Sequence, residues 1–175
     1  MRLTISALLT SLVLAGTSAC ATGYPTRPGG PVLDQAGVIP EVAENTLDVK
    51  LRRYFSNTCR AVVVATVSSL KGETVDSYAT HLANKWKIGD PVRGDGVLLL
   101  VAPVERKVRI AVSRSLQSAM SDRAAADIIQ GGMMERYRRG DYAEGVSQGI
   151  DAIMARLNEY ASPNESCRPI NEGSQ

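Results

Sequence analysis

Three aspartates lie on predicted loops, where their carboxylates could hold a metal ion. Asp34 follows a short apolar segment, Asp95 lies between two glycines before an apolar segment, and Asp122 follows Ser121. Loops that lead into strands and helices can meet at one rim of a sheet, and oxygen ligands suit Ca²⁺ or Mg²⁺. The structural alternative is turn chemistry at Asp34 and Asp95 and helix capping at Asp122. These three aspartates are the candidate metal ligands.

A serine motif offers a second kind of chemistry. Residues 145–149 read Gly-Val-Ser-Gln-Gly, which matches the nucleophile elbow of α/β-hydrolases. That elbow requires a sharp turn from a strand into a helix, whereas this segment continues a helical pattern with no strand before it. The single histidine, His81, also lies upstream of Ser147 instead of downstream. We therefore interpret Gly145 and Gly149 as sites of close helix packing, and His81 as a surface residue.

Other chemistries are excluded by the residue inventory. With one histidine and three cysteines, of which at most two are free thiols, the chain cannot supply a four-ligand zinc site. It has neither a phosphate loop nor a dinucleotide fingerprint. Its formal net charge of +2 gives no electrostatic argument for binding nucleic acid.

The N-terminus predicts export. Arg2 is followed by an apolar run and then by small residues, as in a secretory signal peptide over residues 1–19. Cys20 then fits the lipid-modified cysteine of a bacterial lipoprotein; the alternative is cleavage after Ala21, which yields a free protein that starts at Thr22. Residues 20–31 are rich in proline and glycine and predict a flexible spacer. We expect a periplasmic lipoprotein, held on a membrane by its lipid anchor.

Two further cysteines predict a disulfide. Cys59 and Cys167 form an even pair in an exported chain, and a bond between them would fix residues 162–175, a polar tail, to the folded domain. The alternative is a pair of unrelated thiols.

Hydrophobic patterning predicts the elements between residues 32 and 161. Periodicity near 3.6 indicates helices over 41–57 and 74–87, from Ser121-Asp122 through Met134, and from Asp141 onward. Apolar runs at 61–67 and 96–102 predict buried strands, and a turn at 103–106 leads to an alternating strand at 107–113 with one solvated face. A short strand at 32–33 can join this sheet. The pattern predicts a three-layer α/β/α sandwich with Val63 and Leu99 in the centre.

Several motifs occur in a distinctive order. They are Val32-Leu-Asp34-Gln-Ala-Gly37, Val62-Val-Val-Ala-Thr-Val, Trp86-Lys-Ile-Gly89, Gly94-Asp95-Gly96-Val-Leu-Leu-Leu-Val-Ala, Arg106-Lys-Val-Arg109-Ile, Ser121-Asp122 and Tyr137-Arg-Arg-Gly140-Asp141-Tyr142-Ala-Glu-Gly145. Over residues 32–157 the chain resembles the TPM-domain family, small α/β modules of thylakoid lumens and bacterial envelopes. The resemblance implies a central sheet flanked by helices.

The resemblance implies several functions. Some members are associated with weak acid phosphatase activity, some with divalent metals, and others with assembly or repair of membrane complexes. Asp34 and Asp95 correspond to the acidic positions near the family's suspected groove. This chain departs where the family has a glycine-rich turn with a carboxylate: residues 113–118 read Ser-Arg-Ser-Leu-Gln-Ser, so Gln117 replaces the acid. Losing a ligand charge weakens the binding of a hard cation.

Two functions follow. The first is a non-enzymatic module, tethered in the envelope, that interacts with or maintains membrane protein complexes. The second is a weak metal-assisted acid phosphatase, in which Asp34 and Asp95 hold the cation and Arg114 contacts phosphate. The spacer, the anchor, the missing acid and the lack of a nucleophile with its base favour the first.

Overall fold

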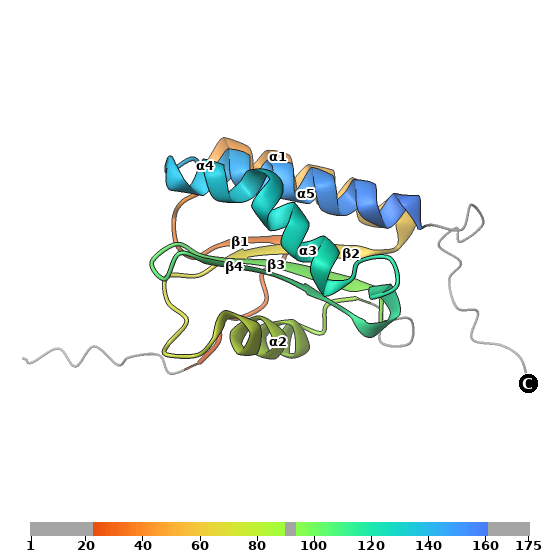
Figure 1. Cartoon of the computed structure of the whole chain (residues 1–175), viewed down its shortest axis with the longest axis horizontal. Coiled ribbons are helices and arrows are strands. Elements are labelled where there is room, and N and C mark those ends of the chain that lie inside the picture. The colour runs from red at the N-terminus through yellow and green to blue at the C-terminus, as the bar shows by residue number, and fades with distance from the viewer. Residues whose placement is uncertain (1–22, 90–93, 161–175) are drawn as a thin grey trace, which may run out of the picture.

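A sheet with helices on both faces makes up the domain (Figure 1). The computed structural model describes residues 23–89 and 94–160. The elements in chain order are β1 (Val32–Asp34), α1 (Glu41–Thr58), β2 (Ala61–Thr66), α2 (Val75–Trp86), β3 (Gly96–Ala102), β4 (Lys107–Val112), a 3₁₀ turn (Arg114–Leu116), α3 (Asp122–Ile128), a π-helical turn (Ile129–Met133), α4 (Met134–Arg138) and α5 (Tyr142–Glu159). The three-layer α/β sandwich predicted from the sequence is confirmed.

The sheet has the strand order β1-β2-β3-β4. The first three strands are parallel, and β4 returns antiparallel to β3. The pairing of Ala61 with Gly96 aligns the starts of β2 and β3, whereas Val32 pairs with Val64. The short β1 therefore contacts only the second half of β2.

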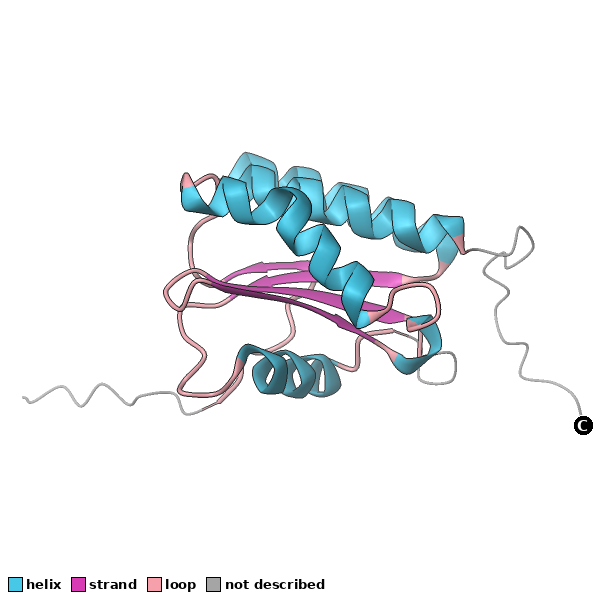
Figure 2. Ribbon diagram, viewed as in Figure 1, coloured by secondary structure: helices cyan, strands magenta, loops and turns pink. Residues whose placement is uncertain are grey.

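The central strand β3 is buried on both faces, and its alternate residues feed two separate cores. Val97, Leu99 and Val101 pack with the helices α1, α3 and α5 on one face. Leu98 and Leu100 pack with α2 on the other face, which Figure 2 shows below the sheet. Val63 and Leu99 both lie in the interior, as expected, but on opposite faces of the sheet.

Strand β4 differs in part from its prediction. Lys107 on its polar face is exposed, as expected, but α2 covers the rest of that face: Ala111 packs against the α2 core, and the Arg109 Nε atom lies 3.0 Å from Asp76 Oδ1. The alternation of residues 107–113 gave no sign of this cover, since an arginine that pairs with a helix looks like a solvated one in sequence.

Part of the segment predicted as a flexible spacer, residues 20–31, contacts α2. The Trp86 Nε1 atom donates to the Pro25 carbonyl at 3.0 Å, and an Arg27 Nη1 donates to the Trp86 carbonyl at 2.7 Å. Residues 24–27, which we call the strap, therefore lie along α2. Residues 20–22, including Cys20, are outside the described residues.

The serine motif lies inside a helix. Gly145 and Gly149 belong to α5, one turn apart, where a side chain would collide with neighbouring residues. A Cβ at Gly149 would come within 2.5 Å of the Met133 sulfur, and one at Gly145 would meet the Tyr137 ring. The two glycines allow the segment after α3 to pack directly on α5, as interpreted from the sequence.

Within residues 23–89 and 94–160, no helix combines the length and the apolarity needed to cross a membrane. Cys59 follows α1 and takes part in a disulfide. Its expected partner Cys167 lies outside the described residues, so the pairing of these two cysteines stays a prediction.

The contact at Gly149 predicts a sharp sensitivity to one methyl group. Gly149→Ala forces Met133 out of its position and is expected to lower the free energy of unfolding by about 1–3 kcal/mol. Gly131→Ala is the matched control, because no atom lies within 4 Å of the added Cβ. The control should be neutral or slightly stabilising. Urea unfolding of both variants measures this difference, and equal stabilities would contradict the packing role.

A bond between Cys59 and Cys167 predicts that substitutions of the two cysteines have non-additive effects on the free energy of unfolding. Cys59→Ser and Cys167→Ser should each lower the free energy of unfolding by about 4–5 kcal/mol, and the double variant should lose no more than either single one. Peptide mapping of the unreduced protein identifies the bond directly. A map that shows both cysteines as free thiols would refute it.

Candidate functional site

The first predicted ligand, Asp34, is used to hold its own loop. Its Oδ2 accepts from the Ile39 N–H at 2.7 Å, and its Oδ1 accepts from the Val38 N–H at 3.2 Å and from the Thr66 hydroxyl. These three bonds tie the end of β1 to β2 and to the turn before α1. The carboxylate therefore has a structural role that accounts for it fully.

Asp95 lies at the start of β3 with 7 % of its surface exposed, in a loop held by two serines. The Gly96 N–H donates to the Ser113 hydroxyl oxygen at 3.0 Å, and the Ser115 hydroxyl donates to the Gly94 carbonyl at 2.6 Å. Both serines belong to the segment in which this chain departs from the glycine-rich turn of the family. The departure thus supplies hydrogen bonds that fix the loop around Asp95.

Asp122 is exposed and forms an ion pair. Its Oδ1 lies 2.8 Å from an Arg109 Nη2, and the same guanidinium reaches Asp76 on α2. Ser121 accepts from the Ala124 N–H at 3.2 Å, so the predicted helix cap is confirmed. Arg109 therefore links the helices on the two faces of the sheet across the edge of β4.

The three aspartates do not come together in one group among the described residues, and metal binding by any of them stays a prediction. Asp34 pairs with Thr66 at the end of β2, whereas Asp95 precedes Gly96, which pairs with Ala61 at its start. These two positions on β2 are five residue steps apart, which corresponds to roughly 17 Å along the strand. Among the described residues, no group of three or more histidine, cysteine or acidic side chains could hold a metal.

The remaining predicted residues, Arg114 and Gln117, belong to the segment after β4 whose serines bond the loop around Asp95. Arg114 begins the 3₁₀ turn directly after Ser113, and Gln117 ends it; both side chains are exposed. This places Arg114 at the opposite end of the sheet from Asp34, so the two cannot contact one phosphate group.

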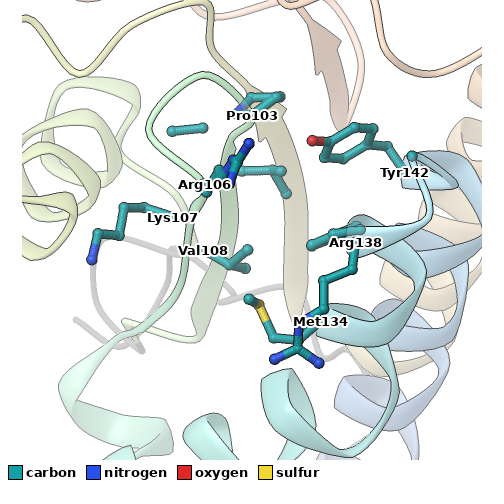
Figure 3. A pocket seen from close by; sticks show the side chains of 11 residues that line it. Pro103, Arg106, Lys107, Val108, Met134, Arg138 and Tyr142 are labelled. Carbon is teal, nitrogen blue, oxygen red and sulfur yellow. The ribbon is translucent and has the colours of Figure 1, made fainter.

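A different feature has the form of a binding site. A groove of about 420 Å³ opens between the β3–β4 turn and the helical segment that ends α4 and begins α5. Figure 3 shows the strand residues on one side and the helical residues on the other. The lining residues are Val101, Ala102, Pro103, Arg106, Lys107, Val108, Met134, Tyr137, Arg138, Gly140 and Tyr142.

The charged side chains of this groove are all basic. Arg106 lies on the strand side and Arg138 on the helical side, while Lys107 extends outward from the turn (Figure 3). Within the described residues, none of these three side chains forms an ion pair. The neighbouring Glu105 is not part of the lining: its Oε1 accepts from the Leu70 N–H at 2.7 Å, and its Oε2 is buried. The groove is therefore positively charged.

Aromatic residues form one wall. The rings of Tyr137 and Tyr142 stack with centroids 5.1 Å apart. The Tyr137 hydroxyl is buried, has no hydrogen-bond partner among the described residues, and has its pKa raised by that burial. Together with Val108 and Met134, the wall offers an apolar surface beside the cationic groups.

The groove was not predicted from the sequence, although two of the motifs that carry the family resemblance contribute residues to its two sides. The segment from Arg106 to Ile110 and the segment from Tyr137 to Gly145 are about thirty residues apart in the chain. The turn between β3 and β4 brings the first against the second.

The sequence pattern of the TPM domain matches residues 32–156. The chain is a member of the TPM-domain family. No curated protein matches the chain.

Solved structures share the TPM fold. The N-terminal domain of a protein from P. gingivalis is 28% identical with a TM-score of 0.68, over 73% of this chain and 82% of that one. The N-terminal domain of cg2496 from Corynebacterium glutamicum is 14% identical with a TM-score of 0.59, over 87% and 92% of the two chains. The protein BA42 from Bizionia argentinensis is 18% identical with a TM-score of 0.59, over 70% and 83%.

The bonds of Asp34 predict that this carboxylate stabilises the TPM domain. Asp34→Asn replaces one of the two carboxylate oxygens with an NH2 donor that faces a backbone N–H group, and it should lower the free energy of unfolding by about 1–3 kcal/mol. Asp122→Asn is the control, because its side chain is 83 % exposed and its ion pair contributes less than about 1 kcal/mol. Thermal unfolding compares the two, and calorimetry with Ca²⁺ should show the same heat for both variants. A loss of Ca²⁺ binding confined to Asp34→Asn would restore the metal interpretation.

Proposed function

We propose that this TPM domain is a non-enzymatic module, tethered in the bacterial envelope, that binds an acidic segment of a partner protein in the groove beside the β3–β4 turn. The observation that carries the proposal is the pairing of two unneutralised arginines, Arg106 and Arg138, across a groove with no carboxylate in its lining. Such a site attracts anions and repels cations, which gives selectivity and faster association more than raw affinity.

The apolar residues that line the groove favour an anionic ligand that also carries apolar side chains. Val108 and Met134 are half-buried, and Tyr142 stacks its ring against Tyr137. A ligand that places an apolar side chain on this surface gains affinity from burial, which a bare inorganic ion does not. The volume of the groove lies in the range of ordinary ligand pockets. A short peptide with alternating acidic and apolar residues meets both conditions.

The carboxylates near the helical side of the groove form ion pairs with arginines other than Arg138, which supports the binding of an acidic ligand. Glu135 forms an ion pair with Arg139, and Asp141 caps α5 and lies 3.6 Å from an Arg136 Nη1. These pairs leave the charge of Arg138 available to a ligand.

The alternative, a weak metal-assisted acid phosphatase, receives less support. It needs a cation held by several carboxylates, and the described residues keep Asp34 and Asp95 at opposite ends of the sheet. Hydrolysis of a phosphomonoester in the presence of Mg²⁺ or Ca²⁺ tests it. Fast turnover that Asp95→Asn abolishes without unfolding the domain would refute the non-enzymatic proposal.

Charge reversal in the groove should abolish recognition of an acidic peptide. The probe is a five-residue peptide that alternates glutamate with phenylalanine and leucine, titrated into isotopically labelled protein and followed by NMR. We expect shifts in the amides of residues 101–108 and 134–142. In Arg106→Glu/Arg138→Glu the dissociation constant should rise at least about tenfold.

The matched control reverses two arginines elsewhere. Arg53 and Arg123 are exposed on α1 and α3, far from the groove in the fold, so Arg53→Glu/Arg123→Glu has the same net charge as the groove variant. The control should bind like the unmodified protein. Equal losses in both variants would show a general charge effect, and shifts confined to other surfaces would refute the site. A peptide with lysine in place of glutamate should not bind.

A further inference from the structure

The strap, residues 24–27, is held on α2 by bonds from four side chains. The Tyr24 hydroxyl donates to Glu73 Oε1 at 2.6 Å, and Lys85 Nζ donates to the Tyr24 carbonyl at 2.7 Å. The bonds of Trp86 and Arg27 described above fix its other end. The strap is therefore part of the domain surface.

Aromatic contacts strengthen this attachment. The Tyr24 ring meets the buried ring of Tyr78 edge-on, with centroids 4.9 Å apart. The hydrogen bond to Glu73 raises the pKa of Tyr24 to about 12 and lowers the pKa of Glu73. Tyr24 is thus neutral and Glu73 charged at neutral pH, which is the pairing that this bond requires.

The strap leaves little chain for a tether. Only three residues separate Cys20 from Tyr24. Four residue steps span at most about 14 Å when fully extended. A lipid at Cys20 would therefore keep the α2 layer near the membrane, whereas α1 and α5 lie on the far side of the sheet (Figure 1).

Exposed cations surround the strap. Arg27, Lys85 and Lys87 are exposed, and the first two donate to carbonyl oxygens, which leaves their charge uncompensated. Three acidic residues lie on the same side of the sheet. Asp76 forms an ion pair with Arg109, Glu73 accepts from the Tyr24 hydroxyl and lies 3.0 Å from His81 Nδ1, and Glu105 accepts from the Leu70 N–H. A basic surface beside a lipid anchor attracts anionic headgroups.

We propose that the strap orients the domain, so that α2 faces the membrane and Arg27, Lys85 and Lys87 contact anionic lipid headgroups. The proposal rests on the tether in the proposed function. Its consequence for the groove is direct. Val101 and Tyr137 of the groove belong to the core on the α1 and α5 side of the sheet. The groove then lies away from the lipid and remains accessible to a partner.

The orientation can be measured without relying on natural acylation. The mature chain from Cys20 onward is coupled through Cys20 to a maleimide lipid in nanodiscs of phosphatidylcholine and phosphatidylglycerol, and peptide mapping verifies the coupling site. A fraction of the lipids carries a gadolinium chelate. Amide relaxation in the labelled protein then reports the distance of each helix from the lipid surface.

We expect the amides of α2 to relax at least about threefold faster than those of α1 and α5. In Tyr24→Ala/Arg27→Ala the strap detaches and the tether lengthens. The ratio of the amide relaxation rates of α2 to those of α1 should then fall toward one. Thr26→Ala, an exposed position in the same segment, is the control and should keep the bias. Nanodiscs of phosphatidylcholine alone should show a smaller bias.

Equal relaxation of α2 and α1 in the unmodified protein would overturn the proposal, as would an unchanged bias in the double variant. The natural tether is tested separately by the intact mass of the exported protein. A mass that begins at Thr22 without acyl groups would refute the tether in the proposed function, while the coupled sample still decides whether the strap orients the domain.

Discussion

The complete burial of β3 on both faces is the constraint on which the rest of the domain depends. A strand whose seven residues are all buried requires a helical layer on each side of the sheet. Leu98 and Leu100 are covered by the single helix α2, and Leu99 by the layer that contains α1 and α5. The strand also leads directly into the turn that carries Arg106. The groove and the strap thus lie in layers that β3 holds apart.

The layers of the fold could be predicted from hydrophobic periodicity, but the relative positions of the aspartates could not. The apolar run at residues 96–102 matches β3 residue for residue. Hydrophobic periodicity does not give the relative direction of the strands. Because β1, β2 and β3 are parallel, Asp34 at the end of β1 and Asp95 before the start of β3 lie at opposite ends of the sheet. A structural role in the turn was also an open interpretation of Asp34, and the hydrogen bonds of its carboxylate favour it.

The proline- and glycine-rich composition of residues 20–31 predicted a flexible spacer, but contacts of single residues fix the strap to the domain. Proline and glycine around Tyr24 are typical of a linker, yet one ring that packs on Tyr78 and one carbonyl that accepts from Trp86 are enough to fix the strap. The groove escaped notice for a related reason. Arg106 and Arg138 each look like ordinary surface cations, and only the meeting of the β3–β4 turn with the end of α4 makes them a pair.

The two edges of the sheet bear on self-association. β1 is only three residues long, which gives another chain little backbone to pair with. The longer edge strand β4 carries Lys107 and Arg109, and the guanidinium of Arg109 is bound by Asp76 and Asp122 from both sides of the sheet. Charged residues on an edge oppose the addition of a strand from a second molecule. Molecules confined to a two-dimensional surface meet far more often than in solution, so these guarded edges would let many copies crowd together without forming intermolecular sheets.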